Sequence, residues 1–151
     1  MTAMTDRIER TVELRASIER VWRAITDHRE FGEWFEVDLD GPFAAGEVST
    51  GRITTKGYEG APWRVQVTSM DEPNVLAFTW HPYDVDPGVD LSDEQTTLVE
   101  FRLEANGTGT RLTITESGFD GLADPRRLEA FRSNNEGWSI QTDNIRRYVD
   151  G

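Results

Sequence analysis

DPRRLEAFRSNNEGWSIQTDNIRRYV, residues 124–149, is the stretch that decides the fold of this chain. Asp124 suits the N-cap of a helix, and Pro125 follows at the first helical position, where a missing N–H does no harm. Seven positions separated by steps of three and four fall on one helical face: Leu128, Phe131, Asn135, Trp138, Thr142, Ile145 and Val149. The stretch therefore predicts one long amphipathic helix, or two helices broken near Asn134.

Polar residues interrupt the apolar face of this predicted helix. Asn135 and Thr142 lie within the face, and Asn134 and Gln141 lie on its edge. Polar groups that face the interior of a protein need hydrogen-bond partners or water. We therefore expect part of the helix to overlook a cavity.

The N-terminal part of the chain predicts one strand and two short helices. Residues 7–15 alternate between apolar and polar side chains, which is typical of a half-buried strand. Ser17 suits the N-cap of a helix over residues 18–25, and Asp27 suits the cap of a further helical turn that Gly32 ends.

Five further strands are predicted, over residues 47–55, 61–71, 74–80, 95–105 and 109–117. Turn residues separate them, and Asn-Gly-Thr-Gly at 106–109 is the strongest hairpin signal. One face of each strand is apolar and the other polar, as in an antiparallel sheet covered on a single side. The chain is therefore predicted to be an α+β protein, with a curved antiparallel sheet of about six strands wrapped around a long C-terminal helix. A single domain is expected over residues 1–151.

The composition excludes several kinds of partner and site. The chain carries 16 Lys and Arg against 28 Asp and Glu, a formal net charge of −12, which repels nucleic acid and anionic membranes. The absence of cysteine excludes disulfides, thiolate zinc sites and a cysteine nucleophile. No signal peptide or apolar run of membrane-spanning length is found, so a cytoplasmic protein without membrane insertion is expected.

Short motifs occur along the chain in a recognisable order. They are Val21-Trp22, Trp34, Phe78-Thr79-Trp80, residues 96–103, Thr110-Arg111-Leu112-Thr113, residues 116–120 (ESGFD) and Gly137-Trp138. In this order they resemble the SRPBCC or START-like superfamily, which includes the birch-pollen allergen family, lipid-transfer domains and polyketide cyclases. The branch they resemble is that of homologues of the activator of heat-shock-protein (Hsp) ATPase.

This resemblance covers nearly the whole chain and implies the helix-grip fold, with a cavity between the sheet and the long helix. Members of the superfamily bind or transform small apolar molecules, and some act as co-chaperones. The family often has a histidine where this sequence has Glu116, so a role held by that histidine does not carry over.

Glu116 is the candidate catalytic residue, because alternation places its carboxylate inward beside Leu112 and Ile114. Enzymes obtain general acids by burying a carboxylate away from charged partners. The alternative is a structural ion pair with Arg10, which also faces inward on the first strand. Whether the protein is an enzyme is therefore left open, with His81 or Tyr83 as helpers of Glu116.

Aromatic and inward polar residues together predict a ligand site with apolar walls and few orienting donors. The predicted ligand-binding residues are Trp34, Phe35, Trp63, Phe78, Trp80, Phe101, Glu116, Asn135, Trp138 and Gln141. Trp34 and Phe35 lie in a predicted loop, which we expect to form a lid. The alternative is a plain aromatic core made of the same rings.

No metal and no cofactor are expected. His28 and His81 lie far apart, without carboxylates at ligand spacing. The acidic loop between Trp80 and Gln95 lacks the spacing of a calcium-binding loop. The sequence also contains no phosphate-binding loop, dinucleotide fingerprint or nucleophile elbow.

Three functions are left open by the sequence. The first is binding of a small hydrophobic or amphipathic molecule in a cavity between the sheet and the C-terminal helix. The second is co-chaperone-like stimulation of a heat-shock-protein ATPase. The third is a cyclase- or hydrolase-type reaction with Glu116 as general acid or base. The expected partners are accordingly a small hydrophobic molecule, a second copy of the chain in a homodimer, or a chaperone.

Overall fold

The computed structural model describes residues 7–82, 95–122 and 126–151. The cap predicted at Asp124, the adjoining Pro125, Tyr83 and the acidic loop from residue 83 onward lie outside the described residues. The elements are β1 (Arg7–Leu14), α1 (Ile18–Thr26), α2 (His28–Phe35), β2 (Val37–Leu39), β3 (Val48–Ile53), β4 (Pro62–Asp71), β5 (Val75–Trp80), β6 (Thr97–Asn106), β7 (Gly109–Ser117), the short 3-10 helix η2 (Phe119–Gly121) and α3 (Arg126–Asp150).

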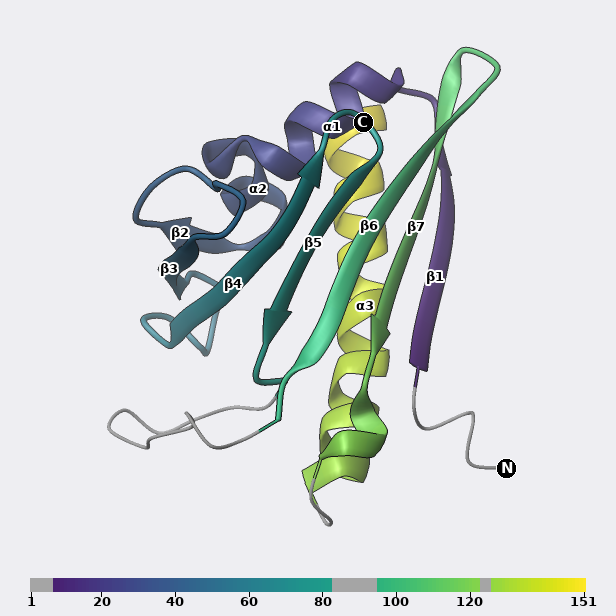
Figure 1. Ribbon diagram of the computed structural model, residues 1–151. Coiled ribbons are helices and arrows are strands. Elements are labelled where there is room, and N and C mark those ends of the chain that lie inside the picture. Colours follow the sequence, from purple (N-terminus) through teal and green to yellow (C-terminus); the bar gives the residue numbers. More distant parts are fainter. Residues whose placement is uncertain (1–6, 83–94, 123–125) are drawn as a thin grey trace.

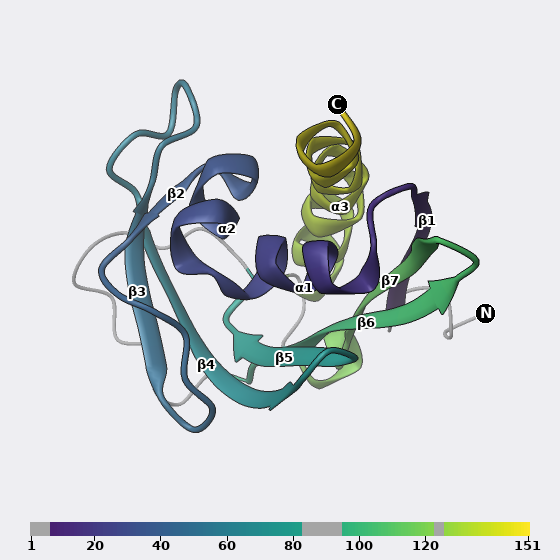
Figure 2. The same ribbon diagram turned by 90° about the horizontal axis from the view of Figure 1, so that it is seen from above.

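The strands form one antiparallel sheet in the order β1-β7-β6-β5-β4-β3-β2 (Figure 1). Figure 2 shows this sheet as a curved wall, with α1, α2 and α3 on its concave face. The α+β helix-grip architecture is therefore confirmed, and the described residues form seven strands instead of about six. The additional strand, β2, has only three residues, too few for an alternating pattern to reveal it.

Both short helices begin where their capping residues predict. Ser17 Oγ accepts a hydrogen bond from the N–H of Arg20 at 3.3 Å. Asp27 Oδ1 accepts from the N–H groups of Arg29 at 2.9 Å and Glu30 at 3.2 Å. Each cap satisfies N–H groups that have no partner within the helix.

The second helix does not end at Gly32 as predicted but continues to Phe35, and Glu36 ends it in a left-handed conformation with φ of 68°. Glycine is needed at position 32 for a different reason, because a β-carbon there would lie 2.3 Å from the carbonyl oxygen of Val37 in β2. Trp34 and Phe35 therefore belong to a helix and are buried. The prediction that they form a loop and a lid is wrong.

The C-terminal helix α3 is continuous over 25 residues, without a break at Asn134. Most of the predicted inward face is confirmed, because Trp138 and Ile145 are buried and Phe131 and Val149 pack against the core. Leu128 and Asn135 were predicted to face inward but are exposed, whereas Asn134 donates a hydrogen bond to Glu116 of the sheet. Helical spacing placed Asn135 on the face and Asn134 on its edge, and spacing alone does not decide which of two adjacent asparagines reaches the sheet. Among the described residues, no helix is long and apolar enough to cross a membrane.

Glu30 on α2 joins the three helices. Its Oε1 accepts from Arg20 Nη1 of α1 at 2.7 Å and from the Tyr148 hydroxyl of α3 at 3.0 Å, while Oε2 accepts from Arg23 Nε at 2.9 Å. Burial alone would raise the pKa of the Glu30 carboxyl, but these hydrogen bonds outweigh it and lower that pKa. Burial and the hydrogen bond to Glu30 raise the pKa of Tyr148 to about 12.

Glu30→Gln is expected to lower the free energy of unfolding by about 1–3 kcal/mol at pH 7, because it replaces a carboxylate that accepts three hydrogen bonds. A carboxyl with a lowered folded-state pKa stabilises the fold above its unfolded-state pKa and loses this effect as the pH falls. The difference between wild type and variant should therefore shrink from pH 7 to pH 3 in urea titrations. Glu33→Gln, at an exposed position of α2, is the control. A difference that stays constant with pH would contradict this role of Glu30.

Candidate functional site

Glu116 is the most deeply buried charged side chain of the described residues, with 0% exposure. It lies on β7 opposite Ile8 of β1 and Val99 of β6, on the same face as Leu112 and Ile114. The alternating pattern of β7 thus places this carboxylate on the concave face of the sheet, as the sequence predicted.

Neutral donors from three other elements converge on the Glu116 carboxylate. Its Oε1 accepts from Trp138 Nε1 at 2.8 Å and from Asn134 Nδ2 at 2.9 Å, both on α3. Its Oε2 accepts from Trp80 Nε1 at 2.8 Å, from Thr97 Oγ1 at 2.5 Å and, more weakly, from Asn134 Nδ2 at 3.1 Å. An ionised carboxylate offers about four acceptor positions, so both oxygens are fully used.

Arg10 is not the partner of Glu116, and the predicted ion pair is wrong. The Arg10 guanidinium instead reaches α3, where Nη2 donates to Asn135 Oδ1 at 2.7 Å and to the Asn135 carbonyl at 2.8 Å. Its Nε donates to Ser139 Oγ at 3.1 Å. Arg10 faces the concave side as predicted, but it lies on the edge strand opposite Ile114, one inward position away from Glu116.

The aromatic residues of the predicted site form one contiguous cluster between the sheet, α2 and α3. Trp80 and Trp138, which both donate to Glu116, stack with ring centroids 5.9 Å apart. Phe35 lies within 6.4 Å of four tryptophan rings of the cluster, those of Trp34, Trp63, Trp80 and Trp138. The members of this aromatic cluster are Phe31, Trp34, Phe35, Phe43, Trp63, Phe78, Trp80, Phe101 and Trp138.

Two predicted site residues lie outside or beside the aromatic cluster. Asn135 is exposed and holds Arg10. Gln141 is half-buried and donates through Nε2 to the Phe35 carbonyl at 3.2 Å, so it borders the cluster and ties α3 to α2. His81 follows Trp80 directly and is half-buried.

The sequence interpretation missed Thr97, Phe31 and Phe43 as members of the site. Thr97 lies two residues before Val99 in β6, whose odd-numbered residues face the concave side of the sheet. The alternating pattern could therefore have predicted that Thr97 faces the site. Phe31 and Phe43 carry no such signal, because α2 and the segment after β2 come together only in the folded chain. Within the described parts of the chain, no three His, Cys, Asp or Glu side chains gather as a metal site.

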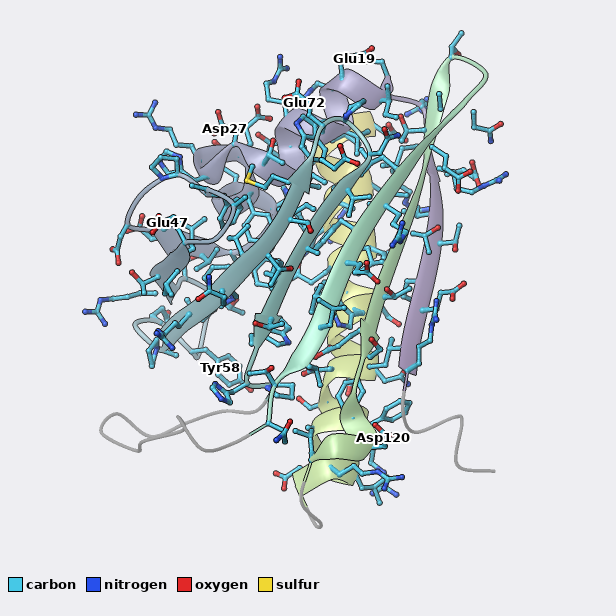
Figure 3. All side chains as sticks on the ribbon, viewed as in Figure 1. Glu19, Asp27, Glu47, Tyr58, Glu72 and Asp120 are labelled. Atoms are coloured by element: carbon cyan, nitrogen blue, oxygen red, sulfur yellow. The ribbon has the colours of Figure 1, made fainter. Side chains whose placement is uncertain are left out.

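A groove of about 600 Å³ lies outside the aromatic cluster, between α1 and the end of β4. Trp22 and Met70 supply its apolar side chains. Glu19, Asp27 and Glu72 supply its acidic ones and lie around α1 in Figure 3. No sequence pattern predicted this groove.

Comparison with known proteins identifies the family. The sequence model of the family described as activator of Hsp90 ATPase homolog 1-like protein matches residues 15–150. The chain belongs to this family. It is thereby a member of the SRPBCC or START-like superfamily, as the sequence motifs indicated. A search of curated protein sequences found no significant match.

Solved structures of similar fold have low sequence identity to the chain. MLL2253 from Mesorhizobium loti is 23% identical, with a TM-score of 0.74 and coverage of 95% of this chain and 96% of that one. Aha1 from Colwellia psychrerythraea, solved as a dimer in solution, is 17% identical with a TM-score of 0.70 and coverage of 95% and 96%. DynU16, from the dynemicin biosynthetic locus, is 22% identical with a TM-score of 0.72. The match to DynU16 covers 95% of this chain but only 47% of that protein. These similarities establish the fold, and the oligomeric state of this chain stays a prediction.

Glu116→Gln is expected to lower the free energy of unfolding by about 2–4 kcal/mol, because one carboxylate oxygen becomes an NH₂ group that faces other donors. Urea titration at pH 7, followed by tryptophan emission, measures the change. Glu104→Gln, on the exposed face of β6, is the matched control and should change stability by less than about 0.5 kcal/mol. Equal effects of the two substitutions would show that the hydrogen bonds to Glu116 do not stabilise the fold.

Proposed function

We propose that the protein binds a small hydrophobic or amphipathic molecule between the sheet and α3, against the aromatic cluster around Glu116. The observation that supports this proposal is the carboxylate itself. Burying an ionised group is costly, and a chain that needed only a core would gain more from apolar side chains at this position. A binding site, by contrast, benefits from a fixed acceptor that holds the faces of the donor indole rings at set angles.

The solvent exposure of the side chains that donate to Glu116 supports access of a ligand from one side. Trp138 is 3% exposed, whereas Trp80 and Asn134 are half-buried. The hydrogen bonds to Glu116 therefore extend from the interior to the protein surface. A ligand that approaches this edge meets Trp80 first, and Trp138 lies stacked behind it.

The filled acceptor positions of Glu116 favour binding over catalysis. A general base needs a free lone pair directed at its substrate, and a general acid needs a proton that it can donate outward. Both oxygens of Glu116 instead accept from Trp80, Thr97, Asn134 and Trp138. A reaction through Glu116 would first have to break one of these hydrogen bonds, so we propose a ligand carrier or receptor.

Binding is testable with 1-aminoanthracene, an uncharged fluorescent probe, and with a panel of lipids, sterols and polyketides that compete with it. We expect saturable binding of the probe and at least one competitor. Trp80→Leu should weaken probe binding about tenfold, because it removes the ring at the edge of the cluster and one donor to Glu116. Trp22→Leu, in the groove beside α1, is the control and should leave the affinity unchanged.

Two results would contradict the proposal. The first is the absence of saturable binding by the probe and by every member of the panel, with folding verified by circular dichroism. The second is an equal loss of affinity in Trp22→Leu and Trp80→Leu, which would place the probe outside the aromatic cluster.

Family membership supports a second candidate, stimulation of an Hsp90 ATPase. This function would use the surface of the protein and does not require a ligand in the aromatic cluster. An ATPase assay with a purified Hsp90 chaperone tests it, and we expect stimulation that does not depend on Trp80. Absence of both stimulation and complex formation would exclude this candidate without affecting the first.

A further inference from the structure

Two buried polar groups of the interior have no hydrogen-bond partner among the described residues: Ser49 Oγ and Trp63 Nε1. The residues are 6% and 7% exposed, and the atoms themselves have essentially no contact with solvent. A buried donor without an acceptor loses its hydrogen bond to water and gains nothing in return. Their presence therefore calls for a physical reason.

The two groups lie on the same face of neighbouring strands. Ser49 of β3 is opposite Val65 of β4, and Gly51 of β3 is opposite Trp63, so Ser49 and Trp63 are diagonal neighbours on the concave face. Gly51 has no side chain above this position. A β-carbon there would also lie 2.4 Å from the carbonyl oxygen of Asp38 in β2.

Aromatic carbon surrounds the Trp63 ring. Its neighbours include Phe31 and Phe35 at centroid distances of 5.9 Å and Phe43 at 6.5 Å. These rings offer no oxygen or nitrogen that could accept from the indole N–H. Ser49 lies on β3 directly opposite Val65, whose apolar side chain likewise offers no hydrogen-bond partner.

The other tryptophans of the aromatic cluster all use their N–H groups. Trp34 donates to the Ala24 carbonyl at 2.8 Å, and Trp80 and Trp138 donate to Glu116. Trp63 is thus the exception among the cluster tryptophans of the described chain. A phenylalanine at this position would fill most of the same space without an unpaired donor.

We infer that Trp63 Nε1 and Ser49 Oγ form the polar anchor for an uncharged hydrogen-bond acceptor, such as the carbonyl of an aromatic ketone or quinone. This inference rests on the proposed function and specifies its ligand class. The indole donates to one lone pair of the carbonyl oxygen, and the serine hydroxyl donates to the other.

Charge favours an uncharged ligand over an acid. Trp63 contacts Trp80 at a centroid distance of 6.4 Å, and Trp80 donates to the Glu116 carboxylate. An anionic ligand at the anchor would lie in the negative field of Glu116 and of a chain with a net charge of −12. The aromatic walls select flat apolar ligands, and the anchor selects those that carry a carbonyl oxygen.

The test compares 1-indanone with indane, two bicyclic compounds of similar shape that differ in one carbonyl oxygen. Nitrogen-15 NMR spectra resolve the indole N–H signals of the five tryptophans, and Trp63→Phe identifies the signal of Trp63. We expect 1-indanone to move this signal downfield and to bind about three- to tenfold more tightly than indane, the effect of one hydrogen bond.

Variants separate the anchor from the rest of the site. Trp63→Phe should abolish the preference for 1-indanone while leaving indane bound, and Ser49→Ala should reduce the preference. Trp22→Phe, the same substitution in the groove beside α1, should preserve it. If Trp63→Phe does not fold, the Trp63 signal of the wild type is assigned by sequential NMR instead. Its downfield shift with 1-indanone then still tests whether Trp63 Nε1 donates to the ligand.

Three outcomes would overturn the inference. Equal affinities for the two compounds in the wild type would remove the anchor but leave the proposed ligand site intact. A Trp63 signal that stays unchanged and shows contact with a resident water would show that Trp63 Nε1 and Ser49 Oγ hydrogen-bond to that water and not to a ligand. Failure of both compounds and of 1-aminoanthracene to bind would remove the ligand site and the anchor together.

Discussion

A carboxylate without solvent contact is stable only if its oxygens are supplied with donors, and this constraint organises the interior of the protein. Glu116 of β7 receives donors from β5, β6 and α3, elements separated by up to 36 residues from it in sequence. Asn134 and Trp138 lie one helical turn apart, so both reach the carboxylate only at one rotation of α3. The same hydrogen bonds thereby set the helix phase and the angles of the Trp80 and Trp138 rings.

Much of the architecture could be predicted from local patterns. Alternation located β1 and β3–β7, the caps Ser17 and Asp27 located the two short helices, and the inward position of Glu116 followed from its neighbours in β7. These signals are local because each depends on residues close in sequence. Gly32 was predicted to end a helix, but the contact that requires glycine there comes from Val37 of β2, a strand that no pattern revealed.

The partners of Glu116 could not be predicted in the same way. Arg10 was a reasonable choice because β1 pairs with β7, but its length lets it reach across to α3 instead. The spacing of the apolar residues predicts Asn134 at the edge of the inward face. Only the position of α3 against the sheet, a property of the whole fold, decides between Asn134 and Asn135.

The aromatic cluster determines how a ligand would bind. Its rings contact one another at centroid distances of 4.8–6.5 Å, so a ligand of the proposed kind would have to displace rings instead of filling a rigid cavity. Such displacement would cost binding energy, and a hydrogen bond from Trp63 Nε1, which has no partner among the described residues, would offset part of that cost. In this account Glu116 holds one side of the cluster fixed while the side near β3 adapts to the ligand.

Native mass spectrometry of the protein, freshly purified from its own cells, tests the central claim most directly. The account predicts a complex with one uncharged organic molecule per chain, which is released on unfolding and carries at least one carbonyl oxygen. Protein that shows only the mass of the bare chain, and that takes up no such molecule when these are added back, would contradict the claim that the aromatic cluster around Glu116 is a ligand site.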